Sequence, residues 1–403
     1  MNLLVNGIEQ KLVLPTTLTT KLTIDGVTDV YPVYKIRLDL LYYNDKNDRI
    51  ATWISRYKTE NDIDEISKDD LEKYNAIIHD FVTESNVEKL KSTQKNIEMF
   101  GQQKHGIVLN DGRIIDGNRR FTCLRNLAKE DPKFNYFEAV ILDRDIEENA
   151  KQIKMLELQI QIGEEARVDY DPIDRLVGIY TDIIEDRLLT PHEYAISTNQ
   201  ADSDVEKDVE LATLLVEFLE AVNAPKQFYL ARELDLAGPL RELQMILKKV
   251  KNEDEKNAVK YAVFTNFLLK PEGDLTRFVR QIKKIAGSRY MDEFLEKETD
   301  IAENVMDRLP EVGKVTEETI SDIRKDTIVQ EQLKDTMEIV MNKVKVTDTK
   351  ERPNQILKKI ISSLDEVDQH IFVKLNEEQL YDLREQLELI EEKVREIKSN
   401  LTE

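Results

Sequence analysis

The sequence predicts an α+β domain at its amino-terminal end, followed by an all-α region that ends in a helical hairpin or a coiled coil. β-type runs beside turn signals are concentrated before residue 143. Beyond that point apolar residues recur mainly at three- and four-residue spacing, which is the helical pattern. The chain has 403 residues, which is enough for two or three domains with a core in each.

The composition limits the function classes. A formal net charge of −22 argues against broad affinity for nucleic acid, whose binding depends on neutralising phosphates, but it leaves room for a local basic pocket. One cysteine and four histidines exclude a disulfide framework and a Cys/His zinc cluster. The segment MNLLVNGIEQKLVLP has no signal-peptide pattern, and no run of about 18 apolar residues occurs. We therefore expect a cytoplasmic protein.

The predicted strands come first. Residues 1–60 are expected to form mostly strands and loops, with β-type runs at 11–14, 22–24 and 33–36. Residues 67–100 show helical periodicity. A hairpin is predicted over residues 106–115, where Asn110-Asp111-Gly112 separates two β-type runs, and FEAVIL (137–142) is expected to form a further strand.

A possible anion site follows the hairpin. Asp116-Gly117-Asn118 turns the chain into a helix that runs to Ala128, and Asn118 is the expected N-cap. Arg119 and Arg120 then fall in the first turn, where the helix already carries partial positive charge. Two guanidinium groups beside open backbone N–H groups suit a phosphate. The alternative is that two surface arginines merely follow a turn.

The segment DGRIIDGNRRFTCLRNL resembles the phosphate-binding box of the ParB/sulfiredoxin superfamily. Gly117, Arg119 and Arg120 match the ParB form of that box, and Asn118 stands where ParB usually has Glu. Cys123 lies beyond the arginine pair rather than at the sulfiredoxin cysteine position, so sulfiredoxin chemistry is not expected.

Two flanking segments extend the resemblance. VYKIRLDLLYYNDKNDRI is similar to the ParB opening, which implies that Arg49 reaches the nucleotide pocket, although the same loop also reads as an ordinary Asn/Asp turn. ARVDYDPIDRLVGIYTDI is similar to a second ParB segment, in which Arg167 would close over the triphosphate. Gly163 and Glu164 stand where the family has the Glu and Asn that help hold metal and triphosphate, so that pair is broken, although Glu164 or Glu165 can still bind Mg²⁺. In the nuclease alternative Asp116 or Glu164 would be the metal ligands.

Helix-start signals recur after the arginine box: Asp171 with Asp174, Thr190 with Glu193, and a box beginning at Ser203 all have capping spacing. The two helices that begin at Thr190 and Ser203 occupy the position of the ParB helix-turn-helix. The helix from Ser203 presents acidic residues where a DNA reader needs basic or amide side chains. We expect a helix-turn-helix relic that packs or binds protein, with no direct specific DNA binding.

The carboxyl-terminal residues carry an apolar seam. Leu357, Ile360 and Leu364 begin a three–four alternation that continues to Ile371, and a longer one runs from Leu380 to Leu401. The two segments could pair as an internal hairpin, or with another chain. Self-association or another protein partner is expected here.

The resemblance implies a protein that binds a nucleoside triphosphate, CTP or ATP with Mg²⁺, in DNA segregation, a mobile element or anti-phage defence. One alternative is a metal-dependent nuclease or a weak NTPase; another is an acidic interaction scaffold without nucleotide. The expected divisions are a ParB/sulfiredoxin-like α/β domain at 1–145, a ParB-like helical domain at 146–222, a helical domain at 223–350, and the hairpin or coiled coil at 351–403.

Overall fold

The computed structural model describes the chain except residues 25, 145, 165–170, 272, 311–313 and 402–403, and it does not describe the side chains of 146–148, 163, 164 and 348. Within it the chain forms two compact units, Met1–Val340 and Met341–Glu403. The division into four domains stays a prediction.

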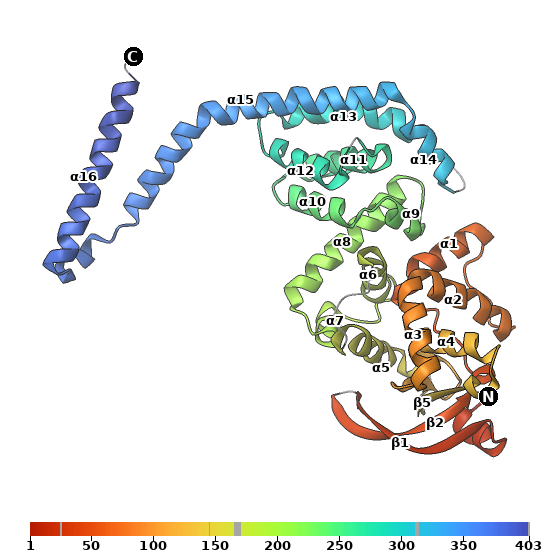
Figure 1. The fold of residues 1–403 in the computed structure, drawn as a ribbon. Helices are drawn as coiled ribbons and strands as arrows, with labels where there is room; N and C mark the ends of the chain where they lie inside the picture. The colour runs from red at the N-terminus through yellow and green to blue at the C-terminus, as the bar shows by residue number, and fades with distance from the viewer. Residues whose placement is uncertain (25, 145, 165–170, 272, 311–313, 402–403) are drawn as a thin grey trace. The chain divides into compact units, whose positions relative to one another are not determined.

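A five-stranded mixed sheet forms the core of the amino-terminal part, in the order β1-β2-β5-β3-β4. Figure 1 labels β1, β2 and β5 of this sheet. Only the β3–β5 pair is parallel among the described pairs, with Gly106 opposite Ala139. The predicted hairpin and the strand FEAVIL are confirmed. The strands are β1 Val13–Ile24, β2 Val27–Arg37, β3 Gly106–Leu109, β4 Ile114–Asp116 and β5 Tyr136–Leu142.

Alternating side chains of the short strands enter two separate cores. Val108 and Ile114 pack with residues of α2, α3 and α4, whereas Ile107 and Ile115 pack with Ile153 of α5. Successive side chains of a strand point to opposite faces of the sheet, and helices cover both of these faces. The helices named here are α2 Leu71–Ser85, α3 Val87–Phe100, α4 Asn118–Ala128 and α5 Ile146–Leu158.

One helix contradicts the expectation of strands and loops up to residue 60. Helix α1 spans Ala51–Asn61. Its first turn receives a cap from a distant residue, because Thr52 N donates to Asp174 Oδ1 at 2.9 Å. Since that acceptor lies 122 residues further along the chain, the local sequence contains no sign of it.

The rest of the first unit is helical. The bounds are η5 Gln159–Glu164, α6 Pro172–Ile179, η6 Tyr180–Glu185, α7 Pro191–Thr198, α8 Asp202–Ala221, α9 Phe228–Glu233, α10 Ala237–Leu247, α11 Glu253–Leu269, α12 Leu275–Ile285, α13 Met291–Met306 and α14 Glu317–Arg324. None of the described helices is both long and apolar enough to cross a membrane.

Two of the predicted helix starts are confirmed and one is wrong. Asp171 caps α6 through Ile173 N, and Thr190 forms a complete capping box with Glu193 at α7. Helix α8 instead begins at Asp202 after Ala201, which offers no capping side chain, so Ser203 is not a cap.

The second unit contains exposed apolar seams. Helix α15 (Thr327–Asp365) continues into this unit from Met341, and α16 spans Glu377–Asn400. Helix α16 has no buried residue, and the seam residues of both helices are exposed or half-buried. A single chain therefore leaves both seams open to solvent.

Candidate functional site

The turn from β4 into α4 forms one wall of a pocket. Gly117 is the N-cap of α4, with φ 106°, and a Cβ there would lie 2.8 Å from Cζ of Phe137. Both the left-handed conformation and the close ring favour glycine. Asn118, expected to be the cap, is instead the first helical residue, so the predicted N-cap is off by one position.

The first turn of α4 has backbone N–H groups that lack an intrahelical acceptor. Its N-cap residue, Gly117, has no side chain that could cap them. Asn118 lines the pocket with only 8% of its surface exposed, and within the described part of the chain its Oδ1 has no hydrogen-bond partner. A buried polar atom of this kind usually has a partner. A ligand or ion in the pocket would supply one.

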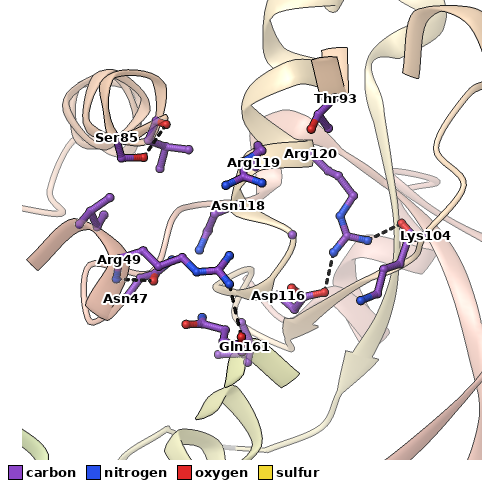
Figure 2. A pocket seen from close by; sticks show the side chains of 14 residues that line it. Asn47, Arg49, Ser85, Thr93, Lys104, Asp116, Asn118, Arg119, Arg120 and Gln161 are labelled. Atoms are coloured by element: carbon purple, nitrogen blue, oxygen red, sulfur yellow. Dashed lines mark hydrogen bonds and ion pairs between the residues drawn. The ribbon is translucent and has the colours of Figure 1, made fainter. Parts of the chain in front are cut away.

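Arg120 is held by three hydrogen bonds. Its guanidinium donates to Asp116 Oδ2 at 2.5 Å and to the carbonyl oxygen of Lys104 at 2.5 Å (Figure 2). It also donates to the carbonyl oxygen of His105 at 2.8 Å. These bonds tie the start of α4 to the segment that leads into β3. Arg120 therefore holds the wall of the pocket in shape.

Arg49 comes from the facing wall. It belongs to the short helical turn η3 (Asp48–Ile50), which Asn47 caps by accepting a hydrogen bond from Arg49 N at 3.1 Å. The Arg49 guanidinium donates to the carbonyl oxygen of Gln161 at 3.4 Å, which places it between the arginine box and η5 (Figure 2).

The pocket encloses about 230 Å³. Its charged side chains are four cations and one carboxylate, and that carboxylate pairs with Arg120, so the pocket is basic inside an acidic protein. The lining residues are Asn47, Arg49, Ile50, Val82, Ser85, Thr93, Lys104, Ile115, Asp116, Gly117, Asn118, Arg119, Arg120 and Gln161.

Six of the eight predicted site residues meet at this pocket: Arg49, Asp116, Gly117, Asn118, Arg119 and Arg120. Arg167 lies outside the described residues, as does the side chain of Glu164. Four further polar lining residues were not predicted from the sequence: Ser85, Thr93, Lys104 and Gln161. They lie outside the arginine box, in segments without a recognisable motif. The roles of all these residues stay predictions.

Two further features bear on the chemistry. Among the described residues no group of three or more His, Cys, Asp or Glu side chains could hold a metal ion. Cys123 is fully buried, and burial raises the pKa of its thiol to about 12. Since the thiolate is the reactive form, this cysteine is not set up as a nucleophile.

Comparisons with known proteins do not show a family. No family model matches the chain. The chain is 27% identical over 172 residues to the mitochondrial ribosome-releasing factor 2 of Drosophila willistoni, and this stretch is 41% of the chain and 21% of that protein. The chain therefore spans about a fifth of that relative's length.

Among solved structures, the chain is similar to a Pnob8-like ParB-N domain in its C2221 form, with 11% identity and a TM-score of 0.32. That match covers 81% of this chain and 100% of the other.

Proposed function

We propose that the pocket binds the phosphates of a nucleoside triphosphate, CTP or ATP, as part of a DNA-related system such as segregation, a mobile element or anti-phage defence. The observation that carries the proposal is that the glycine turn at the start of α4 meets Arg49, Arg119 and Lys104 in one pocket. Backbone N–H groups and guanidinium groups together form a phosphate site. The DNA-related setting comes from the ParB-like arginine box.

The size of the pocket indicates which part of the ligand it takes. Sites for whole small molecules usually measure roughly 300–1,000 Å³. The pocket here measures about 230 Å³ and is lined mainly by polar and charged side chains. The triphosphate fits this chemistry, and the base would lie at the mouth.

Mg²⁺ would enter with the ligand. This ion binds oxygen, keeps several waters, and is commonly held by one or two protein groups together with substrate phosphates. Asn118 Oδ1, which has no partner among the residues that the structure describes, suits that role, and Asp116 is the carboxylate beside it. Because Asp116 Oδ2 already accepts from Arg120, Asn118 is the better candidate of the two.

Calorimetry of the full chain with CTP, ATP, GTP and UTP, each with Mg²⁺, tests the proposal. We expect one nucleotide to bind, and Arg119→Ala to cost about 1.5–3 kcal/mol, the range for hydrogen bonds to charged groups. Arg125→Ala, on the same helix but outside the pocket lining, is the matched control and should bind as the wild type does. Failure of the wild type to bind any nucleotide would overturn the proposal. Full affinity in Arg119→Ala would overturn the role of Arg119.

A further inference from the structure

A cluster of buried charges lies next to the pocket. Lys154 Nζ of α5 is 2.7 Å from Asp48 Oδ1 and 3.2 Å from Asp182 Oδ2 of η6. The three side chains are only 6–8% exposed. The cluster joins three segments that are far apart in the sequence.

Glu157, one turn after Lys154, brings a third carboxyl group. Its Oε2 accepts from Asn44 Nδ2 at 3.2 Å, and its Oε1 accepts from Gln161 Nε2 at 3.0 Å. Burial raises the pKa of Glu157 to about 8. We refer to Asp48, Lys154, Glu157 and Asp182 as the buried cluster.

Such a cluster is a poor source of stability. Removing charges from water costs several kcal/mol per ion, so that apolar residues of similar volume often stabilise a fold as well or better. The location of the buried cluster suggests another purpose. It contains Asp48, which precedes Arg49 in the chain, and it binds Gln161, which accepts a hydrogen bond from Arg49.

The buried cluster is connected to Arg49 from two directions. Asp48 is the residue directly before Arg49 in η3. Gln161, which donates to Glu157, also accepts from Arg49 through its carbonyl oxygen and lines the pocket. Lys154 additionally donates to the carbonyl oxygen of Lys46 at 3.4 Å, so the loop before η3 is held along its length.

Helix α6 packs against the buried cluster at Asp48. A Cβ at Gly178 would lie 2.5 Å from Cγ and 2.6 Å from Oδ2 of Asp48, which leaves no space for a side chain. The α6 backbone therefore lies directly against the Asp48 carboxylate. Any larger residue at 178 must displace either that carboxylate or the helix.

We propose that Lys154 is a positioning residue for Arg49: through Asp48, Glu157 and Asp182 it fixes the 44–49 loop so that the Arg49 guanidinium faces the pocket. The value of this arrangement for ligand binding rests on the proposed function. The positioning itself is a property of the unliganded chain and can be measured without any ligand.

The test uses two variants of the full chain that disturb the buried cluster from opposite sides. Lys154→Met removes the central charge, and Gly178→Ala pushes on Asp48 without changing any charge. Gly238→Ala is the matched control, because its Cβ would lie 2.5 Å from Thr276 Oγ1, in a contact equally tight but outside the cluster. Amide hydrogen exchange is followed at residues 44–50, and calorimetry measures affinity for inorganic triphosphate.

We expect both cluster variants to speed exchange at 44–50 at least tenfold relative to Gly238→Ala, and to weaken triphosphate binding at least tenfold. If Lys154→Met does not fold, Gly178→Ala still decides the question. Unchanged exchange at 44–50 in Lys154→Met, or in Gly178→Ala while α6 keeps its wild-type exchange, would overturn the positioning role. Faster exchange with unchanged triphosphate affinity would show that the positioning of Arg49 does not contribute to ligand binding. A wild type that binds no triphosphate counts against the proposed function instead, and the exchange result still stands.

Discussion

The Arg120 guanidinium holds the Asp116 carboxylate at 2.5 Å, across the glycine turn that begins α4. The same side chain donates to two backbone carbonyl oxygens, those of Lys104 and His105. Arg120 thus braces the turn, and Arg119 is the member of the pair that we propose for phosphate contact.

We predict that Arg120→Ala destabilises the fold. Removal of the Arg120 guanidinium leaves Asp116 and two carbonyl oxygens without their donor, and should cost about 1.5–3 kcal/mol. Thermal melts of the variant and the wild type measure the difference. Equal melting temperatures for the two proteins would contradict the bracing role of Arg120.

A second prediction concerns Glu298 in α13. It is 1% exposed, Asn266 Nδ2 donates to it at 3.3 Å, and burial raises its pKa from 4.5 to about 8. Between these values the folded chain binds a proton that the unfolded chain does not bind, so stability falls as the pH rises.

The free energy of unfolding should therefore lose up to about 1.4 kcal/mol per pH unit through this group over that window. Glu298→Gln should remove this contribution. In urea melts the free energy of unfolding of the variant should therefore rise steadily relative to that of the wild type from pH 5 to pH 8. Glu296→Gln, on the exposed side of the same helix, is the control. Parallel pH profiles for Glu298→Gln and the wild type would contradict the prediction.

The third prediction concerns DNA. Two acidic side chains in the first half of α8 pair within the protein: Asp208 lies 2.6 Å from Arg175, and Glu210 lies 3.3 Å from Lys248. With a chain charge of −22, we expect no specific binding of duplex DNA at physiological salt. Gel shifts against a random duplex pool, with and without nucleotide, check this. Enrichment of one sequence from the pool would show that another surface reads DNA.

The last prediction concerns the α16 seam. Its apolar residues lie open in a single chain, and a helix of this length is marginal in water unless its stripe is buried. We predict a homodimer through this seam. Leu387→Glu would bury an unpaired carboxylate there, at a cost of about 3–5 kcal/mol, and should give a monomer by light scattering.

Leu389→Glu is the matched control, because Leu389 lies on the same helix outside the seam and is similarly exposed, 50% against 45% for Leu387. It should remain dimeric. A monomeric wild type whose Leu387→Glu variant only melts earlier would show that the seam is closed by an internal hairpin.

The sequence alone determined the parts of the fold whose signals are local. The hairpin around Asn110-Asp111-Gly112 and the α6 start at Asp171-Pro172 depend on turn and capping chemistry within a few residues, and both form where predicted. The glycine and arginines of the box are adjacent in the chain, so their meeting at one helix start follows from their spacing.

Tertiary structure decided where distant polar groups pair. Asp174 has the spacing of a cap for its own helix, yet its carboxylate caps α1 and also accepts from Arg232 at 3.1 Å. Lys154 lies in no recognisable motif. Its contact with Asp48 depends on the packing of α5 against η3, which lies 106 residues earlier in the chain. A buried charge must find a partner wherever the packed chain supplies one, and no local pattern encodes that choice.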